Sequence, residues 1–426
     1  MDQAIDHAPS YYAATANPAP DPEPLSGEHD TEVAIVGGGF TGIATALTLA
    51  ERGHAVAVVE ARRVGWGASG RNGGQFTDSI AGEATIRRQL GDEAASFLWH
   101  LRWRGHEIIT ERIQRYGIHC DLKRGHLRAA KKRRQVADLR RDHEEMVRWG
   151  MGEDVRLVEG DELSEVIGSD VYVAGLINRR NGHLHPLNLC LGEAEVARGL
   201  GARIFEQSPV SRIEHGARPT VVGADGRLTA DTVIVAGNAY HELEPGALKG
   251  MLFPATSHII VTEPLGEELA ARINPQDLAV YDCNHIIDYY RLTPDRRLLF
   301  GAGCNYSGHD HADIAGMMRP YMERIFPQLR DVRIDYAWGG RIGIVFNRVP
   351  QLGHVSDNVL HAQGYSGHGI CLSHIVGETL ADALDGNTEN FERFARIRHY
   401  RFPFGQTIGS QMVALGMMYY RMRDIL

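Results

Sequence analysis

Three glycines spaced as Gly37-x-Gly39-x-x-Gly42 follow a short apolar run and open a helical pattern. In this spacing the first glycine allows a tight turn, the second lets a pyrophosphate approach the helix N-terminus, and the third lets the helix pack on a sheet. Glu60 ends the next apolar run, where a carboxylate can accept hydrogen bonds from a ribose diol. The pattern predicts a dinucleotide site, with a purely structural turn as the alternative. We expect contacts from Gly37, Gly39, Phe40, Thr41, Gly42, Glu60, Ala61 and Arg62.

A second glycine-rich segment, residues 67–75, follows Glu60. Its hydroxyl, guanidinium and consecutive backbone N–H groups are donors suited to a further stretch of phosphate and ribityl chain. FAD has that stretch, and a nicotinamide enzyme usually needs no such loop. The segment therefore favours FAD, with a mobile surface loop as the alternative. The expected contacts are Gly67, Ala68, Ser69, Arg71, Asn72, Gly73, Gly74 and Gln75.

A third glycine-rich segment, residues 364–370, precedes a helical pattern at 370–384. The positive end of that helix would stabilise the anionic reduced flavin. A plain glycine-rich entry to a helix is the alternative. The expected contacts are Gly364, Tyr365, Gly367, His368, Gly369 and Ile370.

These motifs need elements that hold them in place. Residues 32–36 and 55–59 are expected to be buried strands around a helix at 42–52, which makes a βαβ unit. Apolar periodicity predicts the other elements. Helices are expected at 83–118, 131–149 and 370–384 and in a final segment with Met412, Leu415, Met418, Tyr419 and Met422 on its apolar face; strands are expected at 207–212, 231–235, 255–262, 278–290 and 297–301.

Composition narrows the class of protein. The net charge of −9 argues against nucleic acid as the main partner. Five cysteines without a CxxC favour a reduced compartment over a disulfide framework. The N-terminus has no signal-peptide pattern, so we expect a cytoplasmic protein. Residues 33–50 carry no charge, but their glycines indicate a strand, turn and helix rather than a membrane span.

With these motifs in view, the sequence resembles the D-amino-acid-oxidase-like superfamily of FAD enzymes, and most closely its gamma-glutamylputrescine oxidoreductase branch. Besides the three motifs, the resemblance covers residues 10–14, 182–189, 233–240, 288–293 and 419–424. It implies an α/β (α+β) fold, in which a Rossmann-like FAD-binding domain carries an inserted antiparallel-sheet substrate domain. It also implies that Val210 contacts the adenine side, and that Ala236, Gly237 and Gly340 lie close to the FAD.

The expected domain division is discontinuous. Of the 48 glycines, ten lie in residues 37–74 and seven in residues 339–369, near opposite ends of the chain. We expect residues 1–30 to be an extended lead-in. We assign 31–82, 151–245 and 336–426 to the FAD-binding domain, and 83–150 and 246–335 to a substrate and helical cap domain.

One departure from the superfamily bears on the substrate. In amino-acid-oxidising relatives this segment resembles W-x-G-x-R, and its Arg binds the carboxylate of the substrate. Here the segment is Trp338-Gly339-Gly340-Arg341-Ile342, in which the Arg comes one position earlier. One step along a strand reverses the face of a side chain. Arg341 is therefore expected to point away from the substrate, which favours an amine over an α-amino acid.

A second substrate hypothesis concerns residues 281–291. Alternation on one strand would place Asp282, Asp288 and Tyr290 on one face, where they would hold a distal ammonium and its methylenes. Arg291, on the other face, would bind a glutamyl carboxylate. The alternative is an ordinary half-exposed strand.

Other clusters are assigned no chemistry. We expect no metal at His309-Asp310-His311 with Asp313, because a second shell is not evident, and no nucleic-acid patch at residues 123–141. Among four lysines, Lys249 alone lies outside that basic region, so it is the candidate for a lysine that promotes an oxygen reaction.

The expected activity is FAD-dependent oxidation of a polyamine or gamma-glutamyl-polyamine to an imine and then an aldehyde. Molecular oxygen, or another acceptor, would regenerate FAD, with hydrogen peroxide as the product of oxygen. The enzymatic alternative is an oxidase or dehydrogenase of sarcosine, glycine or pipecolate. The non-enzymatic alternative is a flavin-bound assembly or electron-relay protein. The general base, a covalent flavin link and the oligomeric state stay open.

Overall fold

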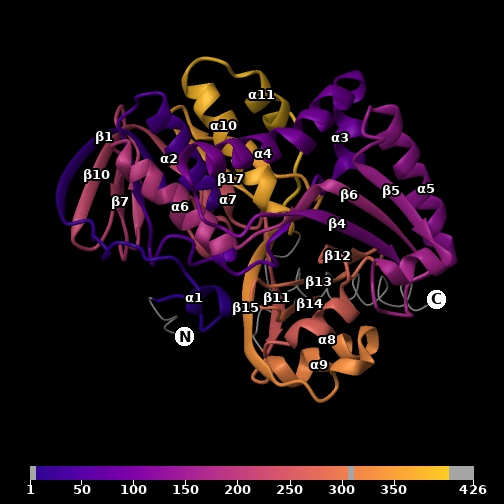
Figure 1. Cartoon of the computed structure of the whole chain (residues 1–426). Coiled ribbons are helices and arrows are strands. Elements are labelled where there is room, and N and C mark those ends of the chain that lie inside the picture. The colour runs from indigo at the N-terminus through magenta and orange to yellow at the C-terminus, as the bar shows by residue number, and fades with distance from the viewer. Residues whose placement is uncertain (1–5, 306–310, 403–426) are drawn as a thin grey trace.

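The computed structural model describes residues 6–305 and 311–402 (Figure 1). Two sheets organise this part of the chain. Sheet A has the strand order β16-β17-β10-β1-β2-β7, with β8 and β9 attached to β10. Sheet B has the order β15-β11-β14-β13-β12-β4-β6-β3, with β5 beside β6. A mostly parallel sheet and a mostly antiparallel sheet, covered by helices, confirm the expected fold class.

The strands of sheet A are β1 (Gly27–Val36), β2 (Val56–Val59), β7 (Arg203–Phe205), β8 (Arg212–Glu214), β9 (Thr220–Val222), β10 (Gly226–Val235), β16 (Gln351–Ser356) and β17 (Val359–Gln363). The strands of sheet B are β3 (Gln75–Phe76), β4 (Lys123–Ala130), β5 (Val155–Glu159), β6 (Ala174–His183), β11 (Phe253–Thr262), β12 (Ala279–Asp282), β13 (Asp288–Leu292), β14 (Leu298–Asn305) and β15 (Ile334–Ile344).

The α-helices are α1 (Tyr11–Ala14), α2 (Phe40–Glu51), α3 (Glu83–Leu90), α4 (Ala94–Tyr116), α5 (Arg133–Arg148), α6 (Pro186–Gly199), α7 (Pro245–Leu248), α8 (Gly266–Ile273), α9 (Ile314–Ile325), α10 (Gly369–Leu384) and α11 (Glu389–Ala395). The predicted final helix and the resemblance at 419–424 lie outside the described residues.

The βαβ unit forms as predicted. β1 pairs in parallel with β2 and with β10, and β10 pairs in parallel with β17. Residues 33–36 and 56–59 are buried throughout, as central strands of a covered parallel sheet are. The uncharged run at 33–50 is therefore strand, turn and helix. No helix in the described ranges is long and apolar enough to cross a membrane.

Two predicted strands are wrong. Residues 207–211 form a loop, and β8 begins only at Arg212. The expected strand at 278–290 is a hairpin, in which β12 pairs with β13 in antiparallel register. Its turn starts where Asp282 Oδ1 accepts the N–H of Asn284 at 3.1 Å. Such a local side-chain bond to the backbone competes with strand pairing and favours a turn.

The domain division remains a proposal, but strands from all three ranges assigned to the FAD-binding domain pair within sheet B. β5 and β6 lie in the range assigned to the FAD-binding part, yet β6 pairs with β4 and β5 within sheet B. β15 crosses the boundary at 336 and pairs with β11 in sheet B, and β3, in the range 31–82, pairs there with β6. Figure 1 shows β4, β5 and β6 on the side of the molecule away from β1 and β10.

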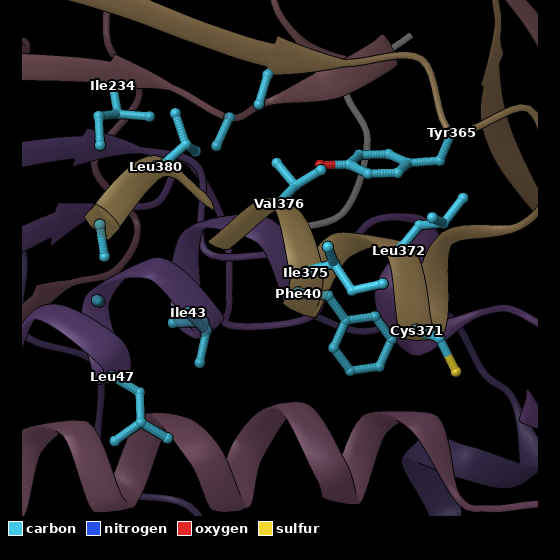
Figure 2. Packing of buried hydrophobic residues seen from close by; sticks show 14 of the residues in the cluster. Phe40, Ile43, Leu47, Ile234, Tyr365, Cys371, Leu372, Ile375, Val376 and Leu380 are labelled. Carbon is cyan, nitrogen blue, oxygen red and sulfur yellow. The ribbon is translucent and has the colours of Figure 1, made fainter. Parts of the chain in front are cut away.

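The main apolar core lies where α10 packs on α2, with contributions from α4, α6 and sheet A (Figure 2). Phe40, Ile43 and Leu47 of α2 are almost completely buried. The two helices approach closely because Gly377 of α10 has no side chain. A Cβ atom there would lie 2.9 Å from the backbone nitrogen of Thr45.

Substituting Gly377→Ala should therefore destabilise the protein, even though alanine favours a helix by about 1 kcal/mol. Overpacking costs about 1–3 kcal/mol, and both atoms nearest to the new methyl group belong to the α2 backbone. Chemical denaturation of the two proteins measures the loss.

Gly199→Ala is the matched control, because Gly199 is also helical and a Cβ there would meet no atom within 4 Å. This variant should be as stable as the wild type or slightly more so. Equal stability of the two variants would contradict the close-packing argument.

Candidate functional site

The first motif lies at the carboxyl ends of the parallel strands of sheet A, where open α/β sheets bind ligands. Gly37 follows β1, and its φ of +114° is a conformation that glycine adopts readily. A Cβ at Gly37 would lie 2.9 Å from the carbonyl carbon of Ala236, which follows β10. The predicted FAD neighbours Ala236 and Gly237 thus lie directly beside the first motif.

The N-terminus of α2 meets the second motif. The backbone N–H of Phe40 donates to Ser69 Oγ at 2.8 Å. A Cβ at Gly39 would lie 2.9 Å from the same oxygen. The N-cap residue Gly39 makes no side-chain cap, so the helix presents N–H groups and a positive end that suit a phosphate.

Glu60 follows β2 and is held by backbone donors. Its Oε2 accepts the N–H of Gly38 at 2.6 Å, and its Oε1 accepts that of Arg62 at 2.8 Å. Burial raises the pKa of Glu60, although these two hydrogen bonds act to lower it. A carboxylate has about four acceptor positions, so lone pairs remain for a ribose diol.

Ala61 and Arg62 continue beside the loop that carries Val210. The N–H of Gln207 donates to the carbonyl of Arg62 at 2.7 Å, and that of Ser208 donates to the carbonyl of Glu60 at 2.9 Å. Val210 therefore lies two residues after Ser208, which bonds directly to Glu60. Val210 is in a loop and not in the predicted strand.

The second motif is a loop held in shape by its own hydrogen bonds. Asn72 Oδ1 accepts the N–H of Gly74 at 2.8 Å, and its Nδ2 donates to the carbonyls of Ala68 and Ser69. Arg71 Nε donates to the carbonyl of Trp66 at 2.7 Å, and its guanidinium lies 4.1 Å from the centre of the Trp66 ring. Both side chains thus shape the loop, and the contacts of Arg71 and Asn72 with FAD stay a prediction.

The third motif contacts the first. Tyr365 Oη and Thr41 Oγ1 are 2.6 Å apart, although 324 residues separate them in the sequence. The N–H of Gly364 donates to Asn238 Oδ1 at 3.0 Å. His368 is the N-cap residue of α10 without capping it by its side chain, and burial lowers its pKa.

β15 completes the set of segments that converge here. Gly340 faces the second motif, because a Cβ there would lie 3.0 Å from Arg71 Cβ. The N–H of Ser366 donates to the carbonyl of Gly343 at 2.9 Å. Tyr240 Oη accepts the N–H of Arg341 at 2.9 Å and donates to its carbonyl at 3.0 Å.

The sequence prediction missed Asn238 and Tyr240 as site residues. Both fall inside the matching segment 233–240, directly after Ala236 and Gly237. Their position in that segment was the available signal. Their role as hydrogen-bond links to residues 341 and 364 appears only when those distant residues lie beside them.

This arrangement fits FAD. A Cβ would fill the space above the α2 N-terminus at Gly39, and the helix there has no side-chain cap. Glu60 lies at the end of β2, and two further glycine-rich segments reach the same edge of the sheet. The donor set therefore matches a pyrophosphate, a ribose diol and a long flavin moiety.

Two substrate hypotheses are wrong. Arg291 is 1% exposed, and its guanidinium donates to the carbonyls of Gly73 and Leu184 at 3.1 Å. It holds sheet B against the second motif and does not reach out for a carboxylate. Tyr290 is fully buried, donates to Tyr172 Oη at 3.0 Å and belongs to the core of sheet B.

The carboxylates of Asp282 and Asp288 lie close to each other, but both form ion pairs with Lys131 of the same chain. Lys131 Nζ lies 2.5 Å from a carboxylate oxygen of each, and Arg324 lies 3.3 Å from Asp288. This pairing corrects the prediction that they hold a distal ammonium. The sequence prediction missed Lys131 because this residue is more than 150 positions away.

Arg341 is half-buried, and strand alternation puts it on the face opposite Gly340 and Ile342. Ile342 occupies the place of the superfamily's arginine. Its Cδ1 would lie 3.9 Å from a Cβ at Gly367 of the third motif. The side chain that faces this motif from β15 is therefore apolar.

Two further sets of candidates remain, Lys249 and the histidines and aspartates of residues 309–313. Lys249 follows α7 with an exposed side chain, so its position offers no support for an oxygen-promoting role. His309 and Asp310 lie outside the described residues, and residues 6–305 and 311–402 contain no group of three or more potential metal ligands.

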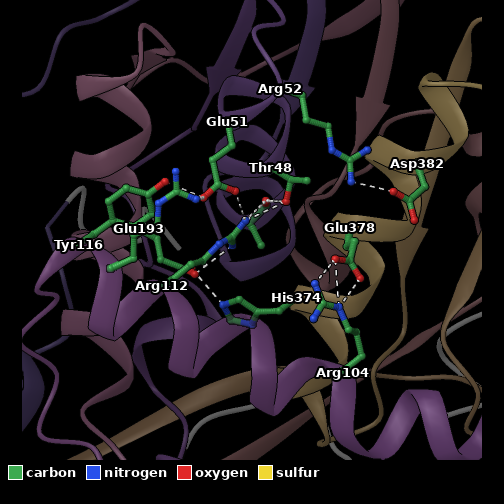
Figure 3. A network of polar contacts seen from close by, with 12 residues as sticks. Thr48, Glu51, Arg52, Arg104, Arg112, Tyr116, Glu193, His374, Glu378 and Asp382 are labelled. Carbon is green, nitrogen blue, oxygen red and sulfur yellow. Dashed lines mark hydrogen bonds and ion pairs between the residues drawn. The ribbon is translucent and has the colours of Figure 1, made fainter.

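A buried ionic network ties α10 to its neighbours (Figure 3). Glu193 of α6 accepts from Arg112 of α4 at 3.1 Å, and its other oxygen lies 2.9 Å from His374 Nε2 of α10. Arg112 also donates to Thr48 of α2 at 2.8 Å. Burial alone would raise the pKa of Glu193, but His374 and Arg112 hold it below its ordinary value.

Known proteins are similar to this chain in sequence and in fold. The family model described as FAD dependent oxidoreductase matches residues 32–383. Gamma-glutamylputrescine oxidoreductase of Escherichia coli (strain K12) is 41% identical, over 98% of this chain and 99% of its own. The crystal structure of L-proline dehydrogenase from P. horikoshii superposes with a TM-score of 0.71 at 22% identity, over 84% of this chain and 94% of that one. Glycine oxidase from Geobacillus kaustophilus gives 0.69 at 22% identity, over 84% and 95%.

Substituting Gly39→Ala should weaken FAD binding about tenfold, because the new methyl group would crowd Ser69 Oγ and the α2 N-terminus. The ratio of flavin to protein absorbance, and a titration of the apoprotein with FAD, measure the change. Gly152→Ala is the control, since a Cβ there would meet nothing within 4 Å. Full retention of FAD by Gly39→Ala would contradict the assignment.

Asp282 gives the protein a pH dependence with a defined sign. Burial raises its pKa to about 6, against the attraction of Lys131. Because the folded state binds this proton more tightly than the unfolded chain, the contribution of Asp282 to stability should fall as pH rises from about 4 to above 6. In Asp282→Asn this component, on the order of 1–3 kcal/mol, should vanish. Urea denaturation across this pH range measures the difference, and parallel curves for the two proteins would refute the interpretation.

Proposed function

The chain belongs to the family of FAD-dependent oxidoreductases, and from this premise we propose that it oxidises a polyamine or gamma-glutamyl-polyamine. The observation that carries the choice of substrate is Ile342. It occupies, on the face toward the third motif, the place where amino-acid-oxidising relatives have a carboxylate-binding arginine. The similarity to gamma-glutamylputrescine oxidoreductase of Escherichia coli supports the same substrate class.

When bound, FAD would supply the difficult chemistry as the acceptor of a hydride from the carbon next to the amine nitrogen. Loss of a hydride leaves the substrate as an iminium ion, which gives up a proton from nitrogen to become the imine, and water hydrolyses this species to an aldehyde and an amine or ammonia. Two electrons then pass to oxygen, which takes up two protons to form hydrogen peroxide. Oxygen as acceptor and the cytoplasmic location stay predictions, and the oligomeric state stays open.

The chain's own residues orient the reactants. Tyr289 lies over Gly73 and Gly301, with its Oη 3.3 Å from Ser257 Oγ, so one wall beside the second motif is aromatic and hydroxyl-lined. The N-terminus of α10 begins at Gly369 without a side-chain cap, and its N–H groups favour negative charge. An apolar residue at 342 avoids repelling a substrate amine.

The alternative of a small secondary amino acid has weaker support. Glycine oxidase and L-proline dehydrogenase share the fold, at identities of 22%. An electron-relay or assembly role without a small substrate has no observation in its favour.

The test is anaerobic mixing of the purified yellow protein with gamma-glutamylputrescine, putrescine, glycine and sarcosine. Gamma-glutamylputrescine or putrescine should bleach the flavin absorption, and readmitted air should restore it with release of hydrogen peroxide. Bleaching by glycine or sarcosine alone would reject the proposed substrate class.

Two variants on neighbouring positions of β15 test the strand-face argument. Ile342→Arg should lower kcat/KM for the amine about tenfold or more, because a cation would then face the third motif. Arg341→Met, on the opposite face, should change kcat/KM less than twofold. The reverse order of effects would show that the faces are assigned wrongly.

A further inference from the structure

Residues 6–17 precede the first strand and form a segment that we name the N-terminal strap. Figure 1 shows its helix, α1, beside β15. Tyr11 and Tyr12 of α1 are 4% and 0% exposed, although the strap lies outside the matched family model, which starts at residue 32. The two rings belong to an apolar cluster with residues of α6, β11, β14 and β15. The strap is therefore part of the packed structure, between a helix beside sheet A and one face of sheet B.

Both ends of the strap are bonded to the cofactor side of the molecule. At one end, the N–H of Asn17 donates to Asn188 Oδ1 of α6 at 2.8 Å. At the other end, Trp66 Nε1 donates to the carbonyl of Asp6 at 2.8 Å. The ring of Trp66 carries the guanidinium of Arg71, a residue of the second motif, at 4.1 Å. The strap thus begins beside the loop expected to bind the flavin.

The middle of the strap is bonded to sheet B. Tyr12 Oη accepts from Arg291 Nη2 of β13 at 3.2 Å, and the ring centre of Tyr12 lies 5.4 Å from that of Trp338 of β15. Tyr11 Oη donates to Asp295 Oδ1 at 2.9 Å, in the turn between β13 and β14. The strap therefore joins the substrate-side sheet to the cofactor side at three strands.

Tyr12 contacts the two side chains that fasten sheet B to the second motif. Arg291 Nε donates to the carbonyl of Gly73 at 3.1 Å, and Trp338 Nε1 donates to the carbonyl of Arg71 at 3.0 Å. Arg291 is buried, and the oxygens that accept from it are three carbonyls and the phenol of Tyr12, all neutral. Hydrogen bonds to a buried charge are costly to lose, so Tyr12 helps to fix the orientation of this guanidinium.

The face of sheet B that the strap holds is the one proposed to meet the substrate. Side chains two positions apart on a strand share a face, so Arg291 lies on the face of Tyr289. For the same reason Trp338 lies on the face of Ile342. Any tilt of this face would move Tyr289 and Ile342 relative to the second motif, and small errors in position cost much of the rate of a reaction.

We propose that the N-terminal strap is a positioning element for the amine reaction and that Tyr12 is its positioning residue. The strap holds the substrate face of sheet B at a fixed distance from the second flavin motif. This inference rests on the proposed function, because the reacting amine would lie between that face and the cofactor. The contacts of Glu60 and of the α2 N-terminus involve no strap residue, so FAD binding should not depend on Tyr12.

The variant Tyr12→Phe removes the hydroxyl and keeps the ring. In anaerobic mixing of the holoenzyme with gamma-glutamylputrescine it should lower the limiting rate of flavin reduction about tenfold, whereas the Kd of FAD should change less than about twofold. Tyr290→Phe is the matched control, because Tyr290 also loses a buried hydroxyl, which donates to Tyr172, but lies on the opposite face of β13. The control should lose stability in urea and keep a reduction rate within about twofold of the wild type. Equal losses of rate in the two variants would overturn the proposal.

Hydrogen exchange without substrate separates this inference from the proposed function. In the holoenzyme, Tyr12→Phe and the more severe Tyr12→Ala should speed amide exchange about threefold or more in β13, β15 and residues 67–75, because these segments lose a shared contact. Exchange in β1 and β2 should stay unchanged. This result supports the strap even if no amine bleaches the flavin. Unchanged exchange in β13, β15 and the loop, or an equal increase in β1 and β2, would overturn it.

Discussion

The packing of α10 against α2 is the contact on which the site depends. Each helix follows a strand of the parallel sheet, α2 after β1 and α10 after β17, so both begin at the same edge. Gly377 allows the two backbones to approach, and the bond between Thr41 and Tyr365 joins the loops in front of them. Two positive helix ends therefore face one region, where a flavin with its phosphates gains most from them.

The ionic network around Glu193 fixes the position of α10. Buried ion pairs contribute little net stability compared with apolar groups, but leaving one charge without its partner is costly. Arg112, Glu193 and His374 come from α4, α6 and α10, so any shift of one helix breaks a buried pair. We infer that the network makes one arrangement of these helices much more favourable than others.

Arg291 plays the corresponding part for sheet B. Its guanidinium reaches the carbonyls of Gly73 and Leu184, and also Tyr12 Oη at 3.2 Å. Trp338 adds a bond from β15 to the carbonyl of Arg71 at 3.0 Å. The substrate-side sheet is thus fastened to the cofactor loop by side chains that are too buried to bind substrate. The aromatic side chain of Tyr289 lies beside the loop, at Gly73.

The sequence by itself determined the cofactor motifs, because their chemistry depends on local spacing. Gly37, Gly39, Gly42 and Glu60 lie within one βαβ unit, so residue types and distances along the chain were sufficient to predict them. The third motif was predicted for the same reason, since a glycine-rich turn before a helix is also local. The sequence also predicted that Arg341 points away from the substrate, because successive side chains on a strand point to opposite faces.

Only the tertiary structure decided the roles of Asp282, Asp288, Tyr290 and Arg291. Alternation was applied to a single strand, but an Asx-type turn at Asp282 converts the segment into a hairpin. Lys131 then neutralises both carboxylates from a distant part of the chain. Which polar groups are paired, and with which partners, depends on neighbours that are distant in sequence, and no local pattern encodes them.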